Sequence, residues 1–207
     1  MTQDERGGPE RSRRADVWVF GQMLFWAALS LLASFVLSVD AVDLARNPKA
    51  NLTCNINSVI SCGKVAVTWQ ASVFGFPNAF LGLITESVVI TVAVACLGGV
   101  RFPRWFMFAA QIGYTLGLIF AYWLFAESLF VIHALCPWCM VLYLSTTLVW
   151  WLLARFNVRE GNLFLPPGLD RRTRELVRSG NDSFIVIAWL VVLVALVLAK
   201  DGSALLG

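Results

Sequence analysis

Four of the five cysteines form two close pairs, and these pairs are the residues best suited to chemistry. Cys136 and Cys139 form a Cys-x-x-Cys motif in "HALCPWCMVLYL", and Pro137 suits the first turn of a helix. Residues three apart share a helix face, and the free amides and dipole at a helix N-terminus favour a thiolate. A thiol with a low pKa is also a good leaving group. The motif therefore predicts a redox-active disulfide.

The second pair, Cys54 and Cys62, brackets the segment "CNINSVISC". Seven residues lie between these cysteines, which is too wide for a zinc knuckle and comfortable for a loop disulfide that opens and closes. Alone, the pair favours a structural bridge, but beside a second pair it favours an electron relay. Two alternatives stay open. The four cysteines could be the four ligands of a zinc site in a membrane scaffold, or mere staples in a non-enzymatic adaptor.

The composition places these pairs in a membrane protein. The 207 residues are 58% hydrophobic and 14% charged, whereas soluble domains average about 45–50% apolar and about 25% charged. The hydrocarbon core of a bilayer takes about 20 apolar residues per helix. An all-α integral membrane protein is expected, and the net charge of +3 gives no indication of nucleic-acid binding. Five stretches are long enough to span: 17–39, 77–99, 103–125, 135–155 and 183–200.

The arginines and lysines predict the orientation, because cytoplasmic loops are enriched in them. With the N-terminus in the cytoplasm, the tail 1–16, the turn 100–104 and the loop from 155 to 182 hold 12 basic residues, against four outside. The chain then divides into a cytoplasmic tail (1–16), a catalytic bundle (17–155) with an outer loop (40–76), a cytoplasmic loop (156–182) and a fifth span with an outer C-terminus (183–207). Both cysteine pairs would lie at the outer face, where thiol oxidation is permitted.

Electrons passed between two dithiols need an acceptor. The sequence contains no dinucleotide-binding fingerprint, and its single histidine leaves a haem or iron–sulfur cluster short of ligands. A lipid-soluble quinone is the natural acceptor, held in an apolar slot by one or two polar groups. Tyr143 lies four residues after Cys139, one turn deeper on the same face, so its hydroxyl could bind a quinone oxygen. The alternative is a tyrosine of the interfacial aromatic belt.

Three motifs together resemble the vitamin K epoxide reductase family, over Leu24 to about Ala154. They are "CNINSVISC", then "VFGFPNAFLG" at the start of the second span, then "CPWC" with Tyr143 beyond it. The order matters, because the analogous bacterial quinone-linked oxidase family, the alternative, has its Cys-x-x-Cys first. The resemblance implies a four-helix bundle around a quinone, with a short half-helix near 58–68 capping it; the fifth transmembrane helix is additional.

The resemblance also implies a role for each matching residue. Cys139 would pass electrons to the quinone, and Cys136 would exchange with the loop pair. Cys54 would meet the external partner, and Cys62 would attack Cys136. The residues implied to contact the quinone are Asn78, Tyr143, Thr68 and Trp69.

The activity expected is that of a quinone-dependent thiol oxidase in the inner or plasma membrane of a bacterium, with menaquinone or ubiquinone as acceptor and no metal. Many bacterial relatives carry a fused thioredoxin-like domain after the bundle. This sequence ends just past the fifth span, so a separate extracytoplasmic thioredoxin-like protein is the expected partner. A vitamin K epoxide reductase of the animal type would use the same residues and stays an alternative.

Three further residues have plain structural interpretations. Glu86 lies mid-way along the second span, where a neutral acid bonded to a neighbouring helix is favoured over a proton relay to the quinone. His133, three residues before Cys136, is expected to be an interfacial histidine, although it could stabilise a thiolate. Cys96 is expected to pack as a small hydrophobic residue.

Overall fold

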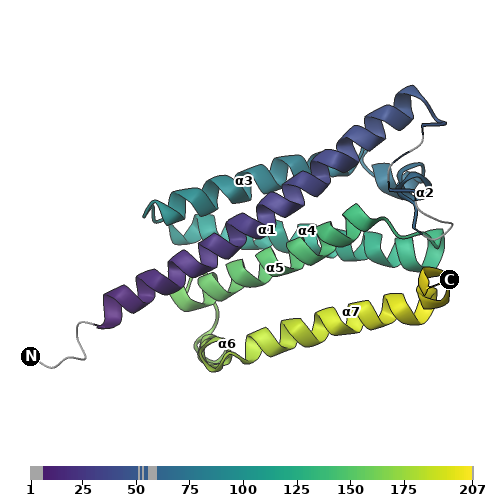
Figure 1. Cartoon of the computed structure of the whole chain (residues 1–207). Coiled ribbons are helices and arrows are strands. Elements are labelled where there is room, and N and C mark those ends of the chain that lie inside the picture. Colours follow the sequence, from purple (N-terminus) through teal and green to yellow (C-terminus); the bar gives the residue numbers. More distant parts are fainter. Residues whose placement is uncertain (1–6, 51, 53, 56–59, 207) are drawn as a thin grey trace, which may run out of the picture.

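The computed structural model describes residues 7–50, 52, 54, 55 and 60–206, with side chains over 13–200 (Figure 1). Their regular secondary structure is helical throughout, which confirms the predicted all-α class. In chain order the elements are α1 (Gly7–Arg46), α2 (Cys62–Ala66), η1 (Trp69–Ser72), α3 (Ala79–Leu97), α4 (Arg104–Glu127), η2 (Ser128–Ile132), α5 (Pro137–Glu160), α6 (Pro167–Ser179) and α7 (Asn181–Leu206).

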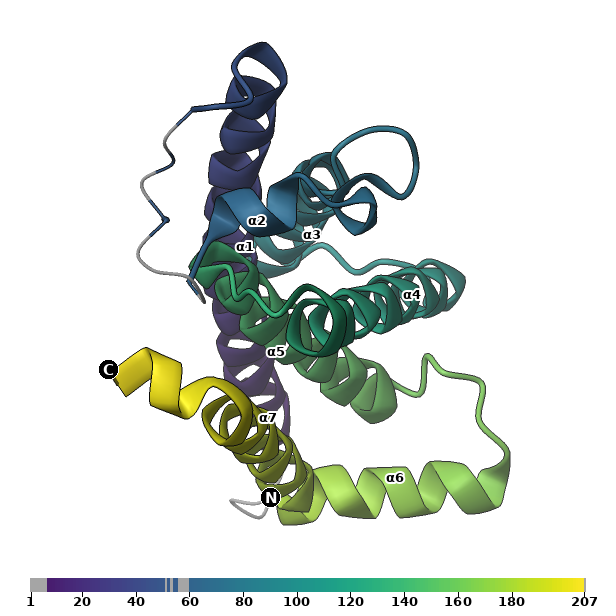
Figure 2. The same ribbon diagram turned by 90° about the vertical axis from the view of Figure 1, so that its right-hand side faces the viewer.

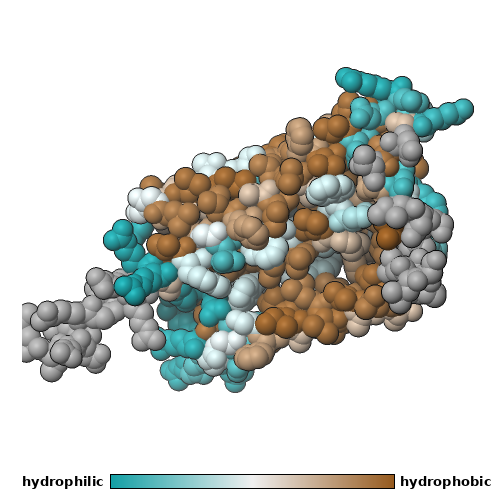
Figure 3. Space-filling model, viewed as in Figure 1, coloured by the Kyte–Doolittle hydropathy of each residue, from teal (hydrophilic) through white to brown (hydrophobic). Residues whose placement is uncertain are grey.

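Among the described residues, five helical segments are long and apolar enough to cross a membrane. They confirm the five predicted spans, and the chain is a multi-pass membrane protein. In Figure 3 a hydrophobic band covers the middle of the visible face, with hydrophilic residues at both ends. The segments are Arg13–Arg46, Ala79–Leu97, Arg104–Ile132, Pro137–Glu160 and Asn181–Lys200.

The first helix is longer than the sequence predicted. It continues through 40–46, "DAVDLAR", where no glycine or proline interrupts it, so part of the expected loop is helical. It ends before Asn47 because Pro48 disfavours helical geometry in the residue that precedes it. At a rise of 1.5 Å per residue, its 40 residues extend about 60 Å. The extra turns bring Asp40 to the level of the cysteines.

The bundle has two chemically different ends, which we call the cysteine end and the arginine end. The cysteine end holds Cys54, Cys62 and Cys136, and the arginine end holds Asp16 and Arg159. Helices α1, α4 and α7 run from the arginine end to the cysteine end, whereas α3 and α5 run back (Figure 1).

Small residues on α1 allow α3 to pack closely against it. Ser30 and Ser34 are fully buried, and Gly82 of α3 lies directly against Ser34. A β-carbon at Gly82 would come 3.0 Å from Ser34 Cβ and closer still to Ser34 Oγ. Small residues at such interfaces let transmembrane helices approach closely. The glycine of "FPNAFLG" is therefore required by this contact.

The arginine end is a packed apolar core closed by polar contacts. Asn157, fully buried, donates hydrogen bonds to the backbone oxygen of Met107 and to Gln111 Oε1, both at 3.1 Å. Arg159 forms an ion pair with Asp16 at 2.9 Å, which joins α5 to α1. The core residues are Val19, Phe20, Met23, Ala27, Ala93, Met107, Val149, Leu152 and Leu153.

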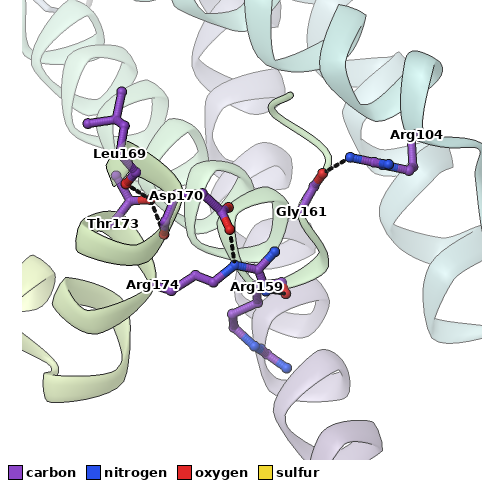
Figure 4. A network of polar contacts seen from close by, with 7 residues as sticks. All are labelled: Arg104, Arg159, Gly161, Leu169, Asp170, Thr173 and Arg174. Atoms are coloured by element: carbon purple, nitrogen blue, oxygen red, sulfur yellow. Dashed lines mark hydrogen bonds and ion pairs between the residues drawn. The ribbon is translucent and has the colours of Figure 1, made fainter. Parts of the chain in front are cut away.

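A short amphipathic helix, α6, continues this polar network. Arg174 binds Asp170 at 2.9 Å and the backbone oxygen of Arg159 at 3.0 Å, and Arg104 donates to the backbone oxygen of Gly161 (Figure 4). These contacts fix the chain between α5 and α7. Because α6 holds four arginines and lies across the helix ends, it fits a membrane-surface segment.

The fifth helix, α7, lies beside α5 on the side away from α3 (Figure 2). Its first turn is held by Asp182, which accepts a hydrogen bond from Trp151 Nε1 at 2.8 Å and lies 3.4 Å from Arg155. Further along, Trp189 Nε1 donates to the Tyr122 hydroxyl at 2.9 Å. Helix α7 thus covers the bundle from outside, and none of its residues up to Lys200 lines the cavity described below.

Candidate active site

The Cys-x-x-Cys motif lies where α5 begins, as the sequence predicted. Cys136 is the N-cap, in an extended conformation, and Pro137 is the first helical residue. The preceding segment is shaped by η2, which ends at Ile132 and is followed by His133 in a left-handed conformation. The residues after His133 contact the segment before Cys62: the backbone N–H of Ser61 donates to the backbone oxygen of Leu135 at 3.1 Å. The chain before Cys136 is therefore joined to the chain before Cys62.

The loop pair is a disulfide between Cys54 and Cys62, with Cα atoms 5.7 Å apart. Cys62 begins α2, whose N-cap Ser61 accepts a hydrogen bond from the Lys64 backbone N–H. Asn55 Oδ1 accepts from Ser61 Oγ and from the Gly63 backbone N–H, both at 3.0 Å. These bonds orient Cys62 toward the start of α5. Of the predicted half-helix near 58–68, α2 is the described helical part, and residues 58 and 59 lie outside the described residues.

The two pairs meet sulfur to sulfur. The Cys136 thiol donates to Cys62 Sγ at 3.2 Å, and each of these side chains is only 1% exposed. Cys139 is a free thiol that is partly accessible. Thiol–disulfide exchange proceeds by attack of a thiolate on a disulfide sulfur. The arrangement therefore joins Cys136 to the loop pair, and Cys139 packs beside this contact as a free thiol.

The helix start changes the acidity of Cys136. The Cys139 thiol donates a hydrogen bond to Cys136 and, with the backbone N–H groups of Cys139 and Trp138, lowers the pKa of Cys136. Burial and the negative charge of Asp40 act in the opposite sense. The lowered pKa favours the thiolate form that exchanges with Cys62.

A cavity of about 860 Å³ extends from the cysteines into the bundle. Its lining is mostly apolar, and α3 and α4, which scarcely touch each other, form two of its walls. Ile84 of α3 and Leu116 of α4 line it and are also exposed on the outside. The cavity therefore reaches the surface between these helices. The predicted site residues that line it are Cys62, Thr68, Asn78, Cys136, Cys139 and Tyr143.

The predicted quinone contacts differ in their surroundings. The Asn78 side chain donates to the backbone oxygen of Gln70 at 2.6 Å and accepts from the Val73 backbone N–H at 3.2 Å, so it also holds the preceding turn. Thr68 Oγ1 donates to the backbone oxygen of Val65 at 2.7 Å. Within the described residues the Tyr143 hydroxyl has no hydrogen-bond partner, while its ring packs on Phe125.

Two candidate residues lie away from the cavity lining. Trp69 is 66% exposed and its ring packs against Trp123 at 5.9 Å, whereas the next residue, Gln70, is buried and lines the cavity. His133 is exposed at the end of η2. A role for either residue in quinone binding or thiolate stabilisation stays a prediction.

Sequence reasoning did not find Asp40. Its Oδ2 lies 3.6 Å from Cys54 Sγ, although 14 residues separate the two in the chain. One carboxylate oxygen of Asp40 and the sulfurs of Cys54 and Cys62 lie within 4.8 Å of one another, a grouping that could hold a metal ion. In the disulfide both sulfurs are bonded to each other, and thiolates are the sulfur ligands of metals. No signal in the sequence linked Asp40 to the cysteines, because its span was expected to end at residue 39.

A family model for the vitamin K epoxide reductase family matches residues 22–154. The chain belongs to this family. The matched range holds both cysteine pairs and all of the cavity's predicted polar residues, while α6 and α7 lie beyond it. Members of the family are oxidoreductases that use quinones as electron acceptors or substrates. No curated protein matches the chain.

Proposed function

We propose that this member of the vitamin K epoxide reductase family is a quinone-dependent thiol oxidase. The observation that carries the proposal is the 3.2 Å contact between Cys136 and Cys62, with Cys139 lining the apolar cavity. Both active-site cysteines line the cavity, and Cys136 is the one in hydrogen-bond contact with the loop disulfide. Such a division of contacts suits a relay.

The first step is exchange with the partner. A thiolate of a reduced thioredoxin-like protein attacks Cys54, and Cys62 leaves as a thiolate. The partner's second thiol then attacks the partner sulfur that is bonded to Cys54, and Cys54 leaves. This releases the oxidised partner and a reduced Cys54–Cys62 pair. Asp40, at 3.6 Å from Cys54 Sγ, is placed to accept or return the thiol proton.

The second step passes the electrons inward. The Cys62 thiolate attacks Cys136 in the Cys136–Cys139 disulfide, and Cys139 leaves. Cys54 then attacks Cys62 and releases Cys136. The loop disulfide is restored and the helix pair is reduced, which is the combination of bonds found in the structure. The lowered pKa of Cys136 makes it a good leaving group.

The third step reduces the quinone. Cys136 and Cys139 give up two electrons and two protons as their disulfide forms, and the quinone takes them up as a quinol. Cys139 makes the contact with the quinone, with Asn78 and Tyr143 binding an oxygen of the ring. Menaquinone and ubiquinone both suit a cavity open to lipid between α3 and α4.

We also propose that the cysteine end faces the outside of a bacterial inner membrane and the arginine end faces the cytoplasm. The arginines of α6 and Arg159 lie together at one end, as cytoplasmic residues do. A reporter enzyme that is active only outside the cytoplasm, fused after residue 207, should be active. An inactive fusion, together with an active one at the turn near 100, would reverse the orientation.

The test of the activity is quinone reduction by the purified protein in detergent, with a reduced thioredoxin-like protein and a soluble quinone analogue. Turnover should be lost in Cys139→Ala and retained in Cys96→Ala, because Cys96 packs near the arginine end. Equal turnover in the two variants would contradict the relay. Conversion of a vitamin K epoxide instead would favour the reductase alternative, and one bound zinc per chain without turnover would favour a scaffold.

A further inference from the structure

One buried acid in the cavity wall, Glu86, has an oxygen without a hydrogen-bond partner among the described residues. Glu86 of α3 is 3% exposed and lies in a helix that spans the membrane. Ionisable residues at such depth are costly and mark functional sites more often than those at a surface. Its side chain lines the same cavity as Cys139, Asn78 and Tyr143.

The two hydrogen bonds of Glu86 both go to one oxygen. Ser30 Oγ of α1 donates to Oε1 at 3.0 Å, and the Tyr114 hydroxyl of α4 donates to the same atom at 2.9 Å. The other oxygen, Oε2, is buried and has no hydrogen-bond partner in the described part of the chain. A protonated carboxyl fits this pattern, with Oε1 as the carbonyl oxygen and Oε2–H as a donor without an acceptor.

A role in joining helices accounts for only half of this arrangement. The bonds to Ser30 and Tyr114 connect α3 to α1 and α4 through Oε1 alone. A buried polar atom left unpaired costs free energy, so native proteins rarely keep one without a reason. A ligand in the cavity that carries an acceptor would supply the missing partner.

The spacing along α3 suits a ring with an oxygen at each end. Glu86 follows Asn78 by eight residues, or about 12 Å along a helix. A spacing on that order accommodates one six-membered ring with an oxygen and a hydrogen bond at either side.

We infer that Glu86 is a second polar subsite of the cavity, whose Oε2–H donates a hydrogen bond to the ring oxygen remote from the cysteines. This inference rests on the proposed function and names its substrate class more closely. The cavity then selects a para-quinone, which has acceptor oxygens on opposite sides of the ring, over a ring compound with only one. Asn78 and Tyr143 bind the near oxygen and Glu86 binds the far one.

The test compares Glu86→Leu, which removes the donor, with Glu86→Gln, which keeps an N–H donor of similar size. Each is measured for the quinone KM and for the Ki of a redox-inert ring ketone with the same skeleton but one oxygen. Wild type should bind the quinone about tenfold more tightly than the ketone, since leaving a buried donor unpaired costs about that much. In Glu86→Leu this difference in affinity should disappear, and in Glu86→Gln it should persist.

Two controls separate the outcomes. Exchange between the partner and the Cys54–Cys62 pair, followed without quinone, should be equal in all three proteins. A loss of this exchange in Glu86→Leu means misfolding, and Glu86→Met, which has a similar length and no donor, then replaces it. Tyr114→Phe removes a hydrogen bond to Oε1 only, so the difference in affinity between quinone and ketone should remain. Loss of this difference in Tyr114→Phe would overturn the inference. An unchanged difference in affinity in a folded Glu86→Leu protein would also overturn the inference. Absence of quinone reduction in wild type would instead refute the proposed function.

Discussion

The cysteine end and the arginine end of the bundle are built for opposite purposes. At the cysteine end Cys62, Cys136 and Cys139 line a cavity of about 860 Å³, which reaches inward as far as Met23 and Leu153 of the core. Much of the polar bonding at this end holds loops and turns in place. At the arginine end the same helices form a close-packed core, closed by Asn157 and the Asp16–Arg159 ion pair. Packing gives the stability at one end, and open space gives the chemistry at the other.

The difference teaches how one bundle can hold a large ligand without falling apart. An apolar cavity forfeits packing contacts and costs stability in proportion to its size. Here α1 contacts both α3 and α5, while α3 and α4 make little contact beyond the hydrogen bond between Glu86 and Tyr114. The cost is thus confined to one side. Substitutions at the cysteine end should therefore abolish chemistry, and those at the arginine end should lower stability.

The largest effect expected is an all-or-none change in bonding at the cysteine end. In the double variant Cys54→Ala/Cys139→Ala, the remaining partners Cys62 and Cys136 have sulfurs 3.2 Å apart and should form a disulfide on mild oxidation. Peptide mapping without reductant would detect it. Adding Cys62→Ala as a third substitution should leave two free thiols, because Cys96 belongs to the core near the arginine end. The double variant should therefore keep one free thiol, Cys96, and three free thiols in it would refute the contact.

The sequence predicted the positions of the helices better than the contacts between them. Hydropathy located all five spans, and Pro137 located the start of α5, because both are local properties. The contact between Cys62 and Cys136 joins residues 74 apart in sequence, and only the family resemblance implied it. The short spacing of Cys54 and Cys62 favoured a disulfide between them. The resemblance implied that Asn78 and Tyr143 contact a quinone, but only the structure shows that both line one cavity.

Asp40 and Glu86 show why parts of the site could not be predicted from the sequence. Asp40 was assigned to a loop because a span of average length ends before it, whereas α1 continues to Arg46. The unpaired oxygen of Glu86 depends on donors from two other helices, Ser30 and Tyr114, which no local pattern brings together. Tertiary contacts decide such features.

The next largest effect is expected between the two ends, where α1 and α3 touch. Gly82→Ala forces a methyl group against Ser34 and should lower the free energy of unfolding by about 1–3 kcal/mol. Gly21→Ala in α1 is the matched control, since nothing lies within 4 Å of the added carbon. It should be neutral or slightly stabilising, because alanine favours helices. Denaturation in mixed detergent would rank the two, and equal stabilities would contradict the close contact.

A smaller effect is expected at the arginine end. Asn157→Ala removes three interior hydrogen bonds, to Met107, Gln111 and Asn162. Interhelical hydrogen bonds in membranes average about 0.6 kcal/mol each, so a loss of about 1–2 kcal/mol in unfolding free energy is expected. Quinone turnover measured well below the unfolding temperature should stay unchanged. A variant of normal stability with poor turnover would break the division between the ends.

The smallest effect is expected where α7 joins the arginine end. Asp182→Asn keeps an acceptor for Trp151 Nε1 and weakens only the ion pair with Arg155, whose side chain is 23% exposed. Partly exposed pairs contribute about 0.2–1 kcal/mol, so unfolding free energy should fall by less than about 1 kcal/mol. High salt should reduce the difference from wild type, because screening already weakens the pair. A larger, salt-independent loss would mean that α7 is part of the stabilising core, because a buried contact and not an exposed charge pair would then hold it.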